Sequence, residues 1–197
     1  MRNMRHHLMI QPFYHDDDFI EDMCRTPKSL YEIMKAEVLP KIMLPKYLLL
    51  SPKSPLAKFF MRKRKMIYLD DLLGELKKHF SYDSKKIILA ILPHYILGFG
   101  DDLAGLTPEP SLSIVSTYGI NERHLSTACV GISLHEIGHC LGLRHCKSEG
   151  CLMKAPCKPK NFYNGVYRLC KEHENKSMHM KTRKQREQKN ISLNRVF

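Results

Sequence analysis

The stretch that decides the fold is HEIGHCLGLRHCKSEGCLM, residues 135–153. Its first part places His135 and His139 four residues apart, and one turn of a helix puts both imidazoles on the same face. Gly142 follows this helical pattern and can take the left-handed conformation that ends a helix and turns the chain. His145 can then return to the other two histidines. Three such ligands leave one position open, as in catalytic zinc sites.

Glu136 stands beside the first histidine, on a neighbouring face of the same expected helix. From there its carboxyl can reach a water at the metal without binding the metal itself. The spacing HExxHxxGxxH is a specific signal for this kind of site. We therefore expect hydrolysis of a peptide bond by a zinc-activated water, with Glu136 as general base and acid.

Cys146 follows His145 directly, and both residue types bind zinc. Adjacent side chains of an extended segment point to opposite sides. His145 can therefore face the helix while Cys146 faces a small C-terminal lobe. The sequence thus predicts two zinc ions, one catalytic and one structural, on the two sides of one peptide bond.

The segment HEIGHCLGLRHC resembles the zinc-binding consensus of the metzincin metallopeptidases. Its continuation, Cys146, Cys151 and then Leu152-Met153, resembles the archaemetzincin (archaelysin) branch. In that family a cysteine follows the third histidine, a second cysteine and the Met-turn methionine come next, and a CxxC pair lies further on. The resemblance covers roughly residues 85–173 and is strongest at 135–153.

This resemblance implies an α+β, metzincin-like fold: a mixed twisted β-sheet, an active-site helix and a zinc-bound C-terminal lobe at about 143–173. It also implies the site residues. The expected catalytic zinc ligands are His135, His139 and His145, with Glu136 as base and Met153 as the Met-turn residue beneath the metal. An extended substrate is expected along an exposed strand, for which residues 111–117 are the candidate.

The distant CxxC of the family appears in this chain as Cys170-Lys171-Glu172-His173, a CxxH. Zinc accepts an imidazole in place of a thiolate. The expected structural site is therefore Cys146, Cys151, Cys170 and His173, with Cys157 as the rival fourth ligand. Three further cysteines, at positions 24, 129 and 140, are interpreted as buried thiols. The histidines at positions 6, 7, 94 and 124 have no partner at ligand spacing.

Upstream, the pattern is one of alternating elements. It predicts helices at 28–39, 70–80 and 121–141, strands at 86–92 and 111–118, and loops at 51–57 and 98–105. The strand at 111–118 is expected at an edge or second from it. Residues 1–173 then form one domain, followed by a basic, flexible tail at 174–197.

The 197 residues carry a formal net charge of +12. One basic cluster is at Lys58 and 62–65, and residues 171–197 form another. Such runs can bind nucleic acid, but solvated faces are commoner, so nucleic acid is an unlikely partner. No run reaches the roughly 18 apolar residues of a membrane span, and no signal-peptide core is evident.

We therefore expect a cytoplasmic or nuclear protein, with reduced cysteines, that acts on peptides or proteins as a monomer. The main alternative is a non-catalytic zinc-stabilised module that binds protein or nucleic acid. A third is a zincin whose competent site is sealed.

Overall fold

The computed structural model describes residues 7–13, 19–31, 35–45, 48–49, 66–80, 83, 85–98 and 104–177. Its centre is a five-stranded sheet in the order β2-β1-β4-β7-β6. These strands are Lys35–Val38, His7–Pro12, Lys86–Leu92, Leu112–Ser116 and Gly105–Glu109. All neighbours pair in parallel except β6, which is antiparallel to β7 and forms an edge. A separate parallel pair joins β3 (Met66–Tyr68) to β5 (Tyr95–Leu97).

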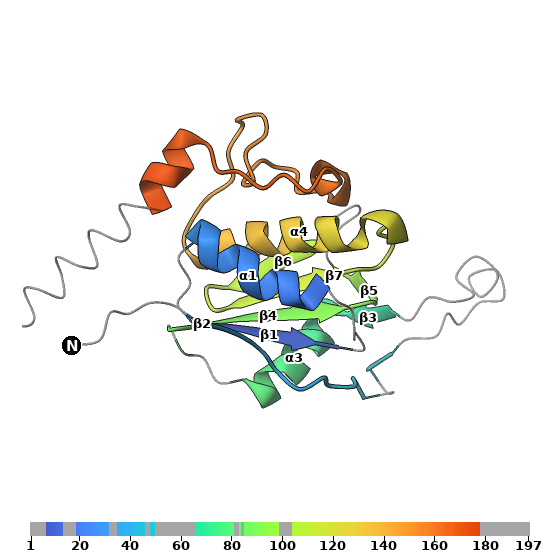
Figure 1. Ribbon diagram of the computed structural model, residues 1–197. Coiled ribbons are helices and arrows are strands. Elements are labelled where there is room, and N and C mark those ends of the chain that lie inside the picture. Colours follow the sequence, from blue (N-terminus) through green and yellow to red (C-terminus); the bar gives the residue numbers. More distant parts are fainter. Residues whose placement is uncertain are drawn as a thin grey trace, which may run out of the picture.

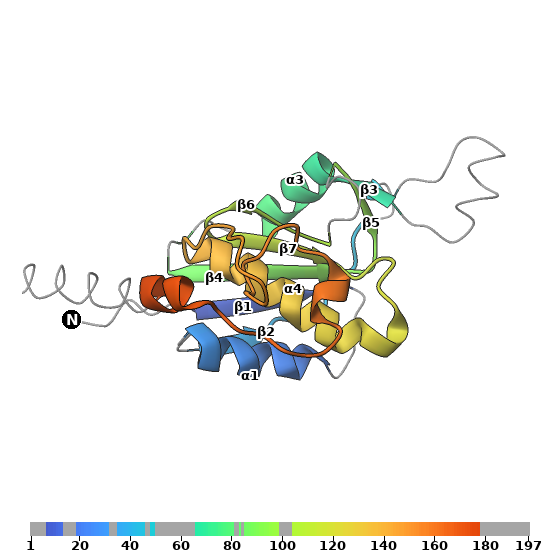
Figure 2. The ribbon, with the colours of Figure 1, turned by 90° about the horizontal axis from the view of Figure 1, so that it is seen from above.

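Helices cover both faces of the large sheet. The helices α1 (Phe19–Tyr31) and α4 (Leu125–Cys140) lie on one face, and α3 (Leu69–His79) lies on the other (Figures 1 and 2). The C-terminal lobe passes over the outer side of α4 and includes two short helical segments, Pro159–Phe162 and residues 171–177. The helix α4 is thus enclosed between the sheet and the lobe.

Strand β4 shows why the sheet needs cover on both sides. Its sequence KIILAIL is apolar at successive positions, and every residue after Lys86 is buried. Ile87, Leu89 and Ile91 join the core beneath α1 and α4. The alternate residues Ile88, Ala90 and Leu92 join a second core with α3. This alternation follows from the two-residue period of a strand, and a continuous apolar run is typical of a central parallel strand.

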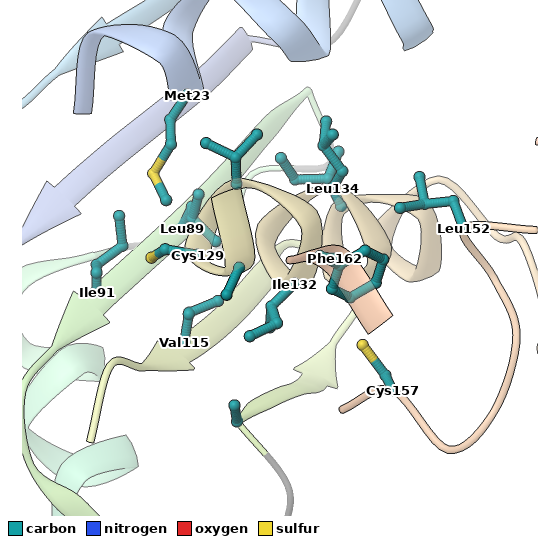
Figure 3. Packing of buried hydrophobic residues seen from close by; sticks show 14 of the residues in the cluster. Met23, Leu89, Ile91, Val115, Cys129, Ile132, Leu134, Leu152, Cys157 and Phe162 are labelled. Atoms are coloured by element: carbon teal, nitrogen blue, oxygen red, sulfur yellow. The ribbon is translucent and has the colours of Figure 1, made fainter. Parts of the chain in front are cut away.

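The helix α4 is apolar on all sides, and residues 128–138 are buried. Figure 3 shows the reason: Leu89, Ile91 and Val115 of the sheet pack on one side of it, and Leu152 and Phe162 of the lobe on another. Gly131 allows the lobe to approach, because a Cβ there would lie 2.2 Å from the Phe162 ring. A helix that is apolar all round is a buried helix.

The expected mixed sheet, active-site helix and C-terminal lobe are confirmed. The predicted elements at 70–80, 86–92 and 121–141 correspond to α3, β4 and α4. The strand predicted at 111–118 is β7, and it is second from the sheet edge, one of the two positions expected. It lies between β4 and β6, and residues 111–117 are all buried. The prediction that an extended substrate lies along residues 111–117 is therefore wrong, because β7 already pairs with a neighbouring strand along each of its two edges.

The helix predicted at 28–39 is also wrong. Helix α1 begins earlier, at Phe19, continues through Pro27 and ends at Tyr31. Residues 35–38 instead form β2, in register with residues 7–10 of β1. Tertiary pairing overrides the local helical period here, since a short segment gains a full ladder of hydrogen bonds at the sheet edge.

Several other predictions fall partly or wholly outside the described residues. Gly105, expected in a loop at 98–105, begins β6. The loop at 51–57, the basic cluster at 58–65, His6 and residues 178–197 of the tail lie outside the described residues. The helix at 171–177 crosses the expected domain boundary at 173. Among the described helices, none combines the length and apolarity needed to cross a membrane.

Candidate metal centres

Helix α4 and the turn that ends it bring three histidines together. His135 and His139 lie one turn apart on α4. At its end, Leu143 N donates to Gly138 O (2.9 Å) and Gly142 takes a φ of 83°. This is the left-handed turn expected of glycine after a helix. The chain reverses there and returns His145 to the other two imidazoles.

The Nε2 atoms of these histidines converge. The Nε2 of His139 lies 3.1 Å from the Nε2 of His135 and 3.1 Å from that of His145. The nitrogens on the other side of two rings are held by backbone carbonyls: His135 Nδ1–H donates to Leu152 O (2.7 Å), and His139 Nδ1–H to Leu143 O (2.9 Å). These bonds fix the tautomer that leaves Nε2 as a lone-pair donor, as for histidine ligands in metalloproteins.

Burial favours the neutral form of two of these imidazoles. His135 is 1% exposed, and burial lowers its pKa to about 4. Burial also lowers the pKa of His139, which is half-buried, whereas His145 is exposed. Neutral imidazole is the form that binds metal ions. Burial therefore favours the metal-binding form of His135 and His139, and no proton has to be displaced from His135 at neutral pH.

Glu136 lies beside this cluster with its side chain only 4% exposed. Thr107 Oγ1 of the edge strand β6 donates to its Oε2 (2.7 Å). Burial raises the pKa of the Glu136 carboxyl to about 7, although the Thr107 hydrogen bond acts in the opposite direction. A cation nearby would favour the carboxylate and lower this pKa. Burial and a bound cation would thus shift the pKa of Glu136 in opposite directions.

A cavity of about 770 Å³ opens onto these groups. The three histidines and Glu136 form one part of its wall. Residues 105–110 of β6 and the following turn form a second part, and Ala155, Pro156 and Cys157 of the lobe form a third. Its volume lies in the range of ligand-binding clefts, about 300–1,000 Å³.

A second cluster joins Cys146, Cys151, Cys170 and His173, whose ligand atoms all lie within 4.8 Å of one another. His173 Nδ1 is 3.2 Å from Cys170 Sγ and 3.6 Å from Cys151 Sγ. Its Nε2–H donates to Arg144 O (2.9 Å), which leaves Nδ1 as the lone-pair donor. Three cysteines and one histidine are a known structural zinc set.

Cys157, the rival ligand, lies elsewhere. Its sulfur lies within 4.8 Å of ligand atoms of His135 and Glu136. Its side chain packs in the core beneath the lobe (Figure 3). Burial and the neighbouring Glu136 raise the pKa of its thiol. The geometry therefore favours His173 over Cys157 in the second cluster.

Met153 is fully buried against the helical turn that carries the histidines. A Cβ on Gly138 would lie 2.6 Å from its Sδ, so glycine at that position lets the methionine approach. The Tyr31 hydroxyl lies 4.0 Å from the same sulfur and donates to Leu134 O (2.9 Å). Met153 thus packs against the turn of α4 that carries the histidines.

Two contributors were not found from the sequence. Thr107 belongs to a strand that the sequence analysis did not predict, and no motif marks it. Cys140, interpreted as an inert thiol, has its Sγ 3.1 Å from Ser113 Oγ, which is itself 3.1 Å from Thr107 Oγ1. Burial raises the pKa of Cys140 to about 11, so it remains a thiol. Cys129 is buried in the core, as expected, and Cys24 is half-buried against it.

No protein-family model matches the sequence, and the comparison with curated proteins finds no match. Solved structures do match. Archaemetzincin from Methanopyrus kandleri has a TM-score of 0.64 at 16% identity, covering 91% of this chain and 97% of that one. A zinc-dependent peptidase from Methanocorpusculum labreanum has 0.59 at 18% identity, covering 86% and 99%.

A third structure, archaemetzincin from Archaeoglobus fulgidus complexed with malonate, has a TM-score of 0.57 at 19% identity, covering 86% of this chain and 98% of that one. Nearly the whole length of each neighbour is matched, so the likeness extends beyond the histidine motif to the sheet and the lobe. At these identities it is a likeness of fold. The chain has the archaemetzincin fold.

Proposed function

We propose that this protein is a zinc-dependent metallopeptidase that hydrolyses peptide bonds with Glu136 as general base and acid. The observation that carries the proposal is the convergence of three Nε2 atoms beside a buried carboxyl at the wall of a cavity. The names of the structural neighbours, archaemetzincin and zinc-dependent peptidase, support it.

The donor set fits zinc. Three imidazoles are a common catalytic zinc arrangement. Two of them, His135 and His139, have their outer nitrogens bound to backbone carbonyls, as is usual for histidine ligands. Zinc held by His135, His139 and His145 would act as a Lewis acid toward the scissile carbonyl. The exposed position of His145 leaves that side of the cluster accessible from the cavity.

Glu136 performs the proton transfers. Its carboxylate accepts a proton from the attacking water, whose oxygen then bonds to the scissile carbonyl carbon. When the carbon–nitrogen bond breaks, Glu136 returns the proton to the departing amine.

An extended peptide substrate would lie along β6. This strand is the free edge of the sheet on the cavity side, and residues 105–109 line the cavity together with Glu136. An edge strand offers unpaired backbone groups to an added strand. The substrate strand is thus β6 in place of the buried β7.

We further propose that the Cys146, Cys151, Cys170 and His173 cluster holds a second, structural zinc ion. All seven proposed ligands belong to one chain, so a monomer suffices for both sites. Residues 1–173 would then form the peptidase domain, with a basic tail after it.

The test compares the wild-type protein with Glu136→Gln, which keeps the shape of the side chain and removes its basicity. We expect two bound zinc equivalents in both proteins. Hydrolysis of a peptide library should fall by at least about 100-fold in the variant, the low end for general acid–base catalysis. A chelator should abolish wild-type activity, and added zinc should restore it.

Zinc binding by the wild type without cleavage of any peptide would contradict this proposal. That result would favour the alternative, a zinc-stabilised binding module. Equal activity in wild type and Glu136→Gln would instead contradict the assigned role of the carboxyl.

A further inference from the structure

We propose that Thr107 is the positioning residue for Glu136: the hydroxyl of the edge strand holds one carboxylate oxygen in place, so that the other is free for the proton transfers. This inference rests on the proposed function. It concerns a residue outside the zinc-binding motif, on an element far from it in the sequence.

Two residues of β6 face Glu136 from the same side. Positions 105 and 107 are two apart on a strand, so they project to one face. Thr107 Oγ1 donates to Glu136 Oε2 at 2.7 Å. Gly105 lies beneath the other oxygen, because a Cβ there would be 2.7 Å from Oε1. Thr107 thus holds Oε2 by a hydrogen bond, and Gly105 leaves space for Oε1.

The Thr107 proton has three acceptors within reach, and geometry selects among them. Glu136 Oε2 is at 2.7 Å, whereas the backbone Glu136 O and Ser113 Oγ are each at 3.1 Å. A hydroxyl carries one proton, and a short bond to a carboxylate is the strongest of the three. The proton therefore points at Oε2.

The hydroxyls behind Thr107 reinforce this direction. Ser113 Oγ can donate to the oxygen of Thr107, and Cys140 Sγ lies 3.1 Å from Ser113 Oγ on the far side. With the thiol proton on Ser113 and the serine proton on Thr107, every donor in this row points toward Glu136. Rows of hydrogen bonds arranged in one direction strengthen each other.

The row also joins the two elements that must keep their relative position. Thr107 and Ser113 belong to the antiparallel strands β6 and β7, and Glu136 and Cys140 lie one turn apart on α4. The base is therefore fixed to the strand along which the substrate would lie. Glu136 and a bound peptide would then both be held in position by contacts with β6.

The test uses Thr107→Val, which keeps the branched shape and removes the hydroxyl, and Thr107→Ser, which restores it. Thr26→Val is the matched control, since the Thr26 hydroxyl donates to Asp22 O of its own helix α1 and does not belong to either cluster. We expect Thr107→Val to lower kcat about 10-fold, as for loss of a hydrogen bond to a charged group. KM and zinc content should stay unchanged, and Thr107→Ser should recover most of kcat.

A second arm separates positioning from a general loss of structure. In the Glu136→Gln background, Thr107→Val should cause no further loss of kcat, because the hydroxyl acts through the carboxylate. A purely structural role would lower kcat equally in both backgrounds, and that result would overturn the proposal. An unchanged kcat in Thr107→Val alone would also overturn it.

A third arm does not depend on activity. Crystal structures of the zinc-loaded variants should show one Glu136 carboxylate orientation in wild type and Thr107→Ser, and a displaced or divided one in Thr107→Val. An identical orientation in all three would overturn the positioning role. If the wild type cleaves no peptide, the proposed function fails, and this structural arm alone decides on Thr107.

Discussion

The two clusters share a peptide bond, between His145 and Cys146, yet they are built in opposite ways. The histidine cluster comes from residues 135–145, one helix and its terminal turn, and opens to a cavity. The cysteine cluster spans residues 146–173, and its histidine is buried. The open site is therefore built from ligands close together in the sequence. The closed site is built from ligands far apart in the sequence, and it links the segments of the lobe.

The clusters also present opposite histidine nitrogens. His135 and His139 donate through Nδ1 to carbonyls and direct Nε2 inward. His173 donates through Nε2 to Arg144 O and directs Nδ1 inward. In each case a backbone carbonyl selects the tautomer. The Arg144 carbonyl precedes His145 directly, so the buried cluster also supports the ligand of the open one.

A further link runs through residues 151–153. Leu152 O accepts the His135 bond, and its neighbours are Cys151 of the buried cluster and Met153 beneath α4. Cys146 N donates to Met153 O (2.9 Å), which closes the connection. Damage to the buried cluster should therefore reach the open one, while the reverse effect should be weak.

The largest expected effect comes from Cys151→Ser. Serine is a poor zinc ligand, so one zinc equivalent should be lost and Tm should fall by more than about 10 °C, since ligand binding and folding are linked at structural sites. Activity should fall as well, because Leu152 loses its support. Metal analysis, thermal melting and peptide cleavage measure the three changes.

Cys24→Ser is the control for this experiment, a half-buried thiol outside both clusters. It should keep both zinc equivalents and full activity. Retention of two zinc equivalents and of wild-type activity by Cys151→Ser would mean that the clusters are independent.

A smaller effect is expected from His173→Cys, which supplies a thiolate at the same position. Zinc should stay bound, but the hydrogen bond to Arg144 O disappears. We expect a Tm lower by about 2–4 °C, the equivalent of about 1 kcal/mol in a chain of this size. His173→Ala, with no ligand atom, should lose the zinc. If His173→Ala retained it, the assignment of His173 would be wrong.

The smallest effect on the metals is expected from Cys157→Ser. This residue lies beside Glu136 and not in the cysteine cluster, so both zinc equivalents should remain and the variant should differ from wild type only slightly in Tm. Loss of one equivalent would restore Cys157 as a ligand. Metal analysis by mass spectrometry after dialysis distinguishes the two results.

Two of the strands that the sequence analysis did not predict, β2 and β6, share a cause. Residues 35–38 have helical spacing, but pairing with β1 makes them a strand. Strand β6 carries Gly105 and Pro108, which are weak strand formers or loop signals, and it forms because β7 and α4 flank it. Each of these elements is short, and it is stabilised by partners outside its own segment. Local periodicity carries no information about such partners.

The sequence by itself determined what short-range geometry controls: the α4 helix, the glycine turn after it, and the meeting of His135, His139 and His145. A helical turn and one left-handed residue fix those positions without help from the rest of the chain. The extended character of the 145–146 step likewise separated the two clusters.

Only the tertiary structure decided the remainder. It places His173 beside Cys146 and Cys151, and Cys157 beside Glu136. It also buries β7 and leaves β6 at the sheet edge, where the Thr107 hydroxyl donates to the Glu136 carboxylate. These are contacts between segments far apart in sequence. They form because burying the faces of the sheet and of α4 brings those segments together, and no local spacing encodes that choice.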